Sequence, residues 1–121
     1  MENSPILLIT RDTLLFTLTK AVLCRDVDIA QTPEQALQAA LGRQHRYAAV
    51  LIDLYTAKGW AWDLLHALCE RPGIPPIVVL TANTSYTMRQ AIRRTCAARL
   101  LYKPFDATAL RRLVLTVAEA A

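Results

Sequence analysis

Residues 48–54 read AAVLIDL, an apolar run that a single carboxylate, Asp53, interrupts near its end. A continuous apolar run of this length, without polar alternation, is typical of a β-strand that is buried on both faces. Strands of this kind occur in parallel sheets whose two faces are covered by helices. The run therefore predicts a central parallel strand with Asp53 close to its carboxyl end.

The segments on either side repeat this pattern. Short apolar runs at residues 6–9, 77–80 and 99–102, and an alternating run at residues 26–29, each precede apolar residues at helical spacing. Because right-handed crossovers join parallel strands, the helices should cover both faces of one sheet. We expect a doubly wound α/β fold of five parallel strands and five helices, in a single domain at residues 1–121. The short run at 26–29 suits a sheet edge.

Capping residues mark where helices begin and end. Asp12 is the expected N-cap of the first helix, and Thr32 that of the second, with Pro33 at its first position and Gln35 closing a capping box. Gly42 marks the end of the second helix. The apolar stripe expected on the first helix consists of Leu14, Leu15, Leu18, Ala21 and Val22.

Composition excludes several classes of protein. The 121 residues are 54% hydrophobic and 20% charged with a mean hydropathy of +0.24, which excludes a disordered tail. No apolar run is long enough to cross a membrane and no signal-peptide pattern is present, so we expect a cytoplasmic protein. Cys24, Cys69 and Cys96 are odd in number and widely spaced, and we expect buried, reduced thiols.

Polar residues gather where the expected strands end. Thr10 and Arg11 follow the first strand, Asp53 ends the third, Thr81 follows the fourth, and Lys103 follows the fifth. Ligand chemistry in parallel sheets collects at the carboxyl ends of the strands. A carboxylate, a hydroxyl and an ammonium that converge there suit the handling of a phosphoryl group, whose charge needs compensation.

Three fragments, in this order, resemble the receiver domains of bacterial two-component response regulators, over essentially the whole chain. They are VLIDL at residues 50–54, VVLTA at 78–82 and KPF at 103–105, with spacings of 28 and 22 residues between Asp53, Thr81 and Lys103. The resemblance implies a flavodoxin-like fold with strand order 2-1-3-4-5. It also implies that Asp53 accepts a phosphoryl group from a histidine kinase, that Thr81 binds it, that Lys103 pairs with it, and that Lys103-Pro104 is cis.

The first strand departs from the pattern of that family. Receivers place two acidic residues directly after it, whereas this chain has Thr10 and Arg11. Magnesium is bound through carboxylates, and a guanidinium offers only donors. With Asp53 and Lys103, an acidic pair would give the site a formal charge of −2, and Thr10 and Arg11 give it +1. We therefore expect magnesium binding to be lost or weak, with no other metal or cofactor.

Three interpretations of Arg11 remain open. Its guanidinium forms a forked ion pair with Asp53 and fills the space of the metal ion, which is the interpretation we favour. Alternatively, it replaces the metal electrostatically and lets an anionic phosphodonor bind without magnesium. In the third interpretation Arg11 points to solvent and Asp53 is a relic.

Two further positions differ from the family pattern. The aromatic residue expected three positions before the lysine is Leu100, and Tyr102 directly precedes Lys103 instead. The loop after Asp53 leads to Trp60 and Trp62, which either form a partner hot spot or pack against the domain. Packing is the interpretation we favour for at least one of them.

The region of the fourth helix, fifth strand and fifth helix is basic. Such a surface repels its own copy, and it favours an acidic protein partner, with nucleic acid involved only indirectly. A solvated basic face without a partner is the competing interpretation. Besides Lys103, the basic residues are Arg89, Arg93, Arg94, Arg99, Arg111 and Arg112.

Two hypotheses of function follow. The first is an atypical, non-enzymatic receiver that works by protein contact without magnesium-dependent phosphorylation, with an acidic protein, a histidine kinase or an effector domain as partner. The second is a conventional receiver, phosphorylated on Asp53 by a histidine kinase, which controls a DNA-binding output domain. Magnesium dependence separates the two.

Overall fold

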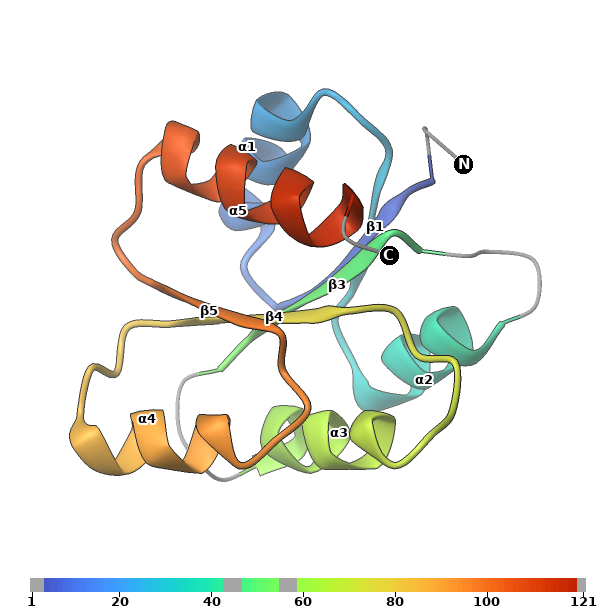
Figure 1. Ribbon diagram of the computed structural model, residues 1–121. Coiled ribbons are helices and arrows are strands. Elements are labelled where there is room, and N and C mark those ends of the chain that lie inside the picture. Colours follow the sequence, from blue (N-terminus) through green and yellow to red (C-terminus); the bar gives the residue numbers. More distant parts are fainter. Residues whose placement is uncertain (1–3, 43–46, 55–58, 120–121) are drawn as a thin grey trace.

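Five parallel strands form one sheet in the order β2-β1-β3-β4-β5, as expected (Figure 1). The computed structural model describes residues 4–42, 47–54 and 59–119. The central strands β1, β3 and β4 are buried along their whole length, in agreement with their continuous apolar sequences. The strands are β1 (Ile6–Ile9), β2 (Val27–Ala30), β3 (Ala49–Asp53), β4 (Ile77–Thr81) and β5 (Arg99–Tyr102).

Five helices cover the sheet, α1 and α5 on one face and α2, α3 and α4 on the other (Figure 1). Successive side chains of a strand point to opposite faces. Ile6 and Leu8 accordingly pack with α1 and α5, whereas Leu7 and Ile9 pack with the other three helices. The helices are α1 (Thr13–Leu23), α2 (Pro33–Leu41), α3 (Gly59–Cys69), α4 (Tyr86–Arg93) and α5 (Ala107–Glu119).

The predicted stripe of α1 is correct for Leu15 and Val22, which pack into the core, and wrong for Leu14, Leu18 and Ala21, which are exposed. Leu15, Thr19 and Leu23 are the buried residues, whereas Leu14 is 80% and Leu18 46% exposed. Both registers place apolar residues at helical spacing, so the sequence pattern alone does not separate them. Asp12 caps the helix, as predicted, by accepting hydrogen bonds from the N–H groups of Leu14 and Leu15.

The helix caps are largely as predicted. Thr32 accepts a hydrogen bond from the N–H of Gln35, and Asp106 accepts one from the N–H of Ala109. Gln35 reaches back to the N–H of Gln31 and not to that of Thr32, so the capping box is shifted by one residue. Gly42 ends α2 in an extended conformation, without the left-handed geometry that favours glycine.

The prediction of three reduced, buried thiols is wrong. Cys69, the last residue of α3, forms a disulfide with Cys96 in the connection between α4 and β5, and their Cα atoms are 5.5 Å apart. Cys24 is free and exposed. The paired cysteines are 27 residues apart in sequence, and only the packing of α3 beside the amino end of β5 brings them together.

None of the helices described is long and apolar enough to cross a membrane.

Candidate functional site

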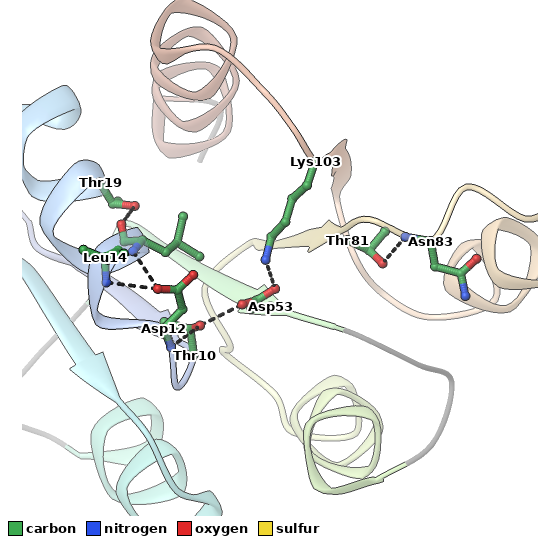
Figure 2. Close-up of polar contacts among 9 residues, drawn as sticks. Thr10, Asp12, Leu14, Thr19, Asp53, Thr81, Asn83 and Lys103 are labelled. Atoms are coloured by element: carbon green, nitrogen blue, oxygen red, sulfur yellow. Dashed lines mark hydrogen bonds and ion pairs between the residues drawn. The ribbon is translucent and has the colours of Figure 1, made fainter.

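The carboxyl ends of β1, β3, β4 and β5 bring four of the predicted site residues to one edge of the sheet. β1 and β4 flank β3 on its two sides, and β5 lies beyond β4. Thr10, Asp53 and Thr81 are all buried, and Lys103 is half-buried. Figure 2 shows Thr10 and Lys103 approaching the Asp53 carboxylate from opposite sides.

Both oxygens of the Asp53 carboxylate have a partner. The hydroxyl of Thr10 donates a hydrogen bond to Oδ2 at 2.7 Å, and the ammonium of Lys103 lies 2.5 Å from Oδ1. The side chain of Asp53 is 0% exposed, whereas that of Lys103 is 21% exposed. A buried carboxylate needs such donors, because its charge is otherwise costly to remove from water. Asp53 is thus one end of an internal ion pair.

Thr10 links this ion pair to the start of α1. Its hydroxyl donates to Asp53 and accepts a hydrogen bond from the N–H of Asp12 at 3.1 Å. Asp12 in turn caps α1, as predicted. The hydroxyl has a single proton, and that proton is directed at Asp53. At this position a carboxylate would repel Asp53, whereas threonine binds it.

Lys103 reaches Asp53 across the end of β4. Its backbone N–H donates to the carbonyl of Thr81 at 2.8 Å, which fixes the segment after β5 against β4. The Lys103-Pro104 peptide is cis, as the resemblance implied. Lys103 follows β5, which is separated from β3 by β4. Its long side chain therefore crosses the end of β4 to reach Asp53.

Thr81 lies at the site without bonding to the carboxylate. Its Oγ1 accepts a hydrogen bond from the N–H of Asn83 at 3.1 Å, and no hydrogen bond joins it to Asp53 (Figure 2). It is fully buried at the end of β4. The structure therefore places Thr81 beside the pair of Asp53 and Lys103, and its predicted role toward a phosphoryl group stays a prediction.

The favoured interpretation of Arg11, a forked pair with Asp53, is wrong. Arg11 is exposed, and it has no hydrogen bond or ion pair in the part of the chain that the structure describes. The reason is that Thr10 and Lys103 already bind both oxygens of a carboxylate that solvent does not reach. The third interpretation, an arginine that points to solvent, agrees with the structure.

The residues at the site do not fit a magnesium ion. Around Asp53 they offer a hydroxyl that donates its proton and an ammonium, whereas magnesium needs several oxygen acceptors in octahedral arrangement. Across residues 4–42, 47–54 and 59–119, no three His, Cys, Asp or Glu side chains are grouped in a way that could hold a metal ion. Weak or lost magnesium binding is part of the proposal made below.

The aromatic residues near the site pack against the domain. Trp60 and Trp62 are half-buried against the core beneath α3, and the Trp62 ring lies 4.7 Å from that of His66 in an edge-on arrangement. Residues 55–58, which lead to them from Asp53, lie outside the described residues. Leu100 packs against the same core, and the buried hydroxyl of Tyr102 has no hydrogen-bond partner among the described residues.

An apolar groove that the sequence did not reveal lies beside Lys103. It has a volume of about 440 Å³, and Leu14 and Leu18 of α1 form one wall. Ala82, Pro104 and Phe105 form the other. The two leucines are four residues apart and therefore share one face of the helix. The sequence pattern predicts that these two leucines belong to the core, whereas the structure places them in the groove.

The predicted basic surface is exposed around the β5 edge of the sheet. Because α4 and α5 cover opposite faces, the arginines flank this edge on both sides (Figure 1). Its role in binding a partner stays a prediction. The exposed residues are Arg89, Arg93, Arg94, Arg99, Arg111 and Arg112.

Solved structures of receiver domains have the same fold. A CheY-like receiver domain protein from Methanospirillum hungatei is 21% identical with a TM-score of 0.81, covering 97% of this chain and 94% of that one. A response regulator from Thermotoga maritima is 17% identical with a TM-score of 0.83, covering 97% and 98%. A response regulator receiver domain from Francisella is 20% identical with a TM-score of 0.80, covering 98% of both chains.

No family model matches the sequence, and no curated protein does. The similarity is thus one of structure, at low sequence identity. It shows that the chain has the CheY-like, flavodoxin-type fold of response-regulator receiver domains.

Proposed function

We propose that the protein is an atypical receiver that transmits a signal by protein contact and does not use magnesium-dependent phosphorylation. One observation carries this proposal. Both oxygens of the buried Asp53 carboxylate are bound by side chains of the protein itself, Thr10 and Lys103. The receiver fold supports a signalling role. In this proposal the protein is cytoplasmic and catalyses no reaction.

The chemistry of phosphoryl transfer supports the proposal. A carboxylate that attacks phosphorus must present a free lone pair, and cations must neutralise the oxygens being transferred. In this chain the hydroxyl of Thr10 occupies one oxygen of Asp53, and Arg11 replaces a metal-binding carboxylate and points to solvent. These bonds lower the nucleophilicity of the carboxylate, because each draws on the electron density of one oxygen, and the site lacks the acceptors that would hold the metal.

Two surface features support contact with another protein. The groove of Leu14, Leu18 and Phe105 presents apolar side chains beside Lys103, and the β5 edge carries the six exposed arginines. Exposed apolar residues of this size often mark interaction sites, and positive charge steers acidic partners. We propose an acidic protein as the partner, of which a histidine kinase or an effector domain are two kinds.

The experiment is a magnesium titration with and without beryllofluoride, followed by the fluorescence of Trp60 and Trp62. These tryptophans begin α3, the element that follows Asp53 in the chain. We expect no saturable change in the wild-type protein. A saturable, magnesium-dependent change that Asp53→Asn abolishes would contradict the proposal and support the conventional receiver.

A restored variant makes a negative result informative. Thr10→Asp with Arg11→Asp returns the acidic pair to its position after β1, and we expect this variant to gain a saturable response to magnesium. Its matched control is Thr10→Asn with Arg11→Gln, which changes the same positions without adding carboxylates. If neither the variants nor the wild type respond to magnesium, the absence of an acidic pair at positions 10 and 11 does not explain why this chain fails to bind magnesium.

The conventional receiver remains the second candidate. The observation that favours it is the pair of Asp53 and Lys103 at the carboxyl ends of the strands. In that case Asp53 is phosphorylated by a histidine kinase and a DNA-binding output domain responds. The same titration decides between the two candidates.

A further inference from the structure

The disulfide between Cys69 and Cys96 lies away from the Asp53 site. Cys96 sits between α4 and β5, and the N–H of Ala98, two residues later, binds the carbonyl of Ile77 at the start of β4. The disulfide is therefore at the amino ends of β4 and β5, and Asp53 is at the carboxyl end of β3. It joins the end of α3 to the connection that follows α4, and these two helices lie on the same face of the sheet (Figure 1).

Cys96 is placed where a thiolate can attack the disulfide. Cys96 is exposed, whereas Cys69 is half-buried against the core. Arg93, Arg94 and Arg99 are within three residues of Cys96 in sequence, and all three are exposed. Positive charge of this kind stabilises attacking and departing thiolates, and such surroundings are typical of reactive cysteines.

The fold does not depend on the disulfide to hold the connection in place. Thr95 donates two hydrogen bonds to the carbonyl of Ile92, one from its N–H at 3.0 Å and one from its hydroxyl at 2.6 Å. The Thr95 hydroxyl also accepts from the N–H of Ala97. The N–H of Cys96 itself binds only the sulfur of Cys69, at 3.2 Å. Reduction thus removes the covalent bond between Cys96 and the end of α3, and only hydrogen bonds then hold the connection, so we expect it to open more often.

We propose that Cys69 and Cys96 form a reversible thiol–disulfide switch, reduced by a dithiol and controlling the mobility of the basic surface around α4 and β5. One thiolate of the dithiol attacks the sulfur of Cys96 and releases Cys69 as a thiolate. The second thiolate then displaces Cys96. The dithiol becomes a disulfide, and the protein gains two electrons and two protons as two thiols. This inference does not rest on the proposed function.

The first test measures whether the disulfide exchanges in the folded protein. The Cys24→Ser variant removes the free thiol, and it is equilibrated in native buffer with increasing ratios of reduced to oxidised dithiothreitol. After alkylation, the intact mass counts the thiols. We expect two thiols to appear together in one reversible transition. A disulfide that resists reduction until denaturant is added would overturn the proposal, because it would then be only a structural bond.

The second test measures what the disulfide controls. Hydrogen exchange is compared between oxidised and reduced protein, and we expect the amides of residues 94–98 to exchange about tenfold faster after reduction. The amides of α5 should not change. A Cys69→Ser, Cys96→Ser variant should match the reduced protein under both conditions, and circular dichroism checks its fold. Equal exchange at residues 94–98 in the two redox states would contradict the switch.

Discussion

The side chain of Asp53 lies where water does not reach, and Thr10 and Lys103 bind its two oxygens. The three residues come from the ends of three different strands, so no one of them alone predicts in the sequence that they meet. The pattern predicted that Asp53 belongs to an internal ion pair, but it named Arg11 as the partner. The structure assigns that place to Lys103 and adds a hydrogen bond from Thr10.

Replacing Thr10 with valine tests the hydrogen bond to Asp53. The substitution keeps the shape of the side chain but leaves Oδ2 of Asp53 and the N–H of Asp12 without their partner. We expect the free energy of unfolding to fall by about 1–3 kcal/mol, measured in urea. Thr17→Val is the matched control, since its exposed hydroxyl binds only the carbonyl of Thr13 in its own helix. Equal losses in both variants would mean that Thr10 does not support Asp53.

Replacing Lys103 with methionine tests the ion pair. We expect the free energy of unfolding to fall by about 2 kcal/mol. This is less than the loss for a fully buried ion pair, because Lys103 is partly exposed to water. Lys103 has contacts besides Asp53, so a double-mutant cycle with Asp53→Asn is needed. A coupling of about 1 kcal/mol or more is expected. Additive losses would show that the two side chains do not stabilise one another.

At the level of elements, the strands were predictable and the rotation of a helix was not. Continuous apolar runs identified β1, β3 and β4 because both faces of these strands are covered. In α1, two registers placed apolar residues at helical spacing, and the predicted one would have buried Leu14. The structure buries Thr19 instead, whose hydroxyl donates to the carbonyl of Leu15. Because Thr19 is polar, the sequence pattern did not predict that it is buried.

Alanine substitutions in α1 check the register that the structure gives. Leu15 is buried against the sheet, and Leu15→Ala should lower the free energy of unfolding by about 2–4 kcal/mol. Leu14 is 80% exposed, and Leu14→Ala should change it by less than about 0.5 kcal/mol. Thermal or urea unfolding measures both. Similar large losses in both variants would instead agree with the stripe predicted from the sequence, which contains both leucines.

Tyr47 ties the start of β3 to the edge strand β2. Its hydroxyl donates to Asp28 at 2.7 Å. Burial raises the pKa of Tyr47 above its ordinary value of 10.0, and the hydrogen bond to Asp28 and the negative charge of Asp28 raise this pKa further. The folded state therefore favours the protonated phenol. Its stabilisation is complete below pH 10 and declines above it, because the phenol then ionises first in the unfolded protein.

Tyr47→Phe tests this dependence on pH. Near neutral pH the variant should be less stable than the wild type by about 1 kcal/mol, because the hydrogen bond to Asp28 is lost. Above pH 10 the difference should shrink, since only the wild type loses the contribution of the phenol. Urea unfolding over a series of pH values measures it. A difference that stays constant up to high pH would contradict the shifted titration.

At the level of the whole molecule, the alternation of strands and helices predicted that helices cover both faces of the sheet, and the resemblance to receiver domains implied its strand order. It did not predict the disulfide, because contact between α3 and the connection before β5 is a product of packing and not of spacing. The groove beside Lys103 was missed for the same reason as the register of α1. The basic surface could be predicted from the sequence, because arginine side chains are exposed in most folds.

The molecule as a whole has the fold of receiver domains, and at its site the side chains of Thr10 and Lys103 bind the carboxylate of Asp53. The fold places Asp53, Thr81 and Lys103 at one edge of the sheet, as the resemblance implied. Thr10 and Arg11 stand after β1, where the resemblance to receivers implied two acidic residues. We propose that Asp53 is for this reason not a magnesium-dependent phosphoacceptor in this chain.

Intact mass spectrometry after incubation with acetyl phosphate and magnesium tests that claim most directly. The account predicts that the wild-type mass is unchanged, while the Thr10→Asp, Arg11→Asp variant gains the mass of one phosphoryl group. Asp53→Asn in the restored background should remove that gain. A phosphoryl group on wild-type Asp53 that requires magnesium and is absent from Asp53→Asn would contradict the account.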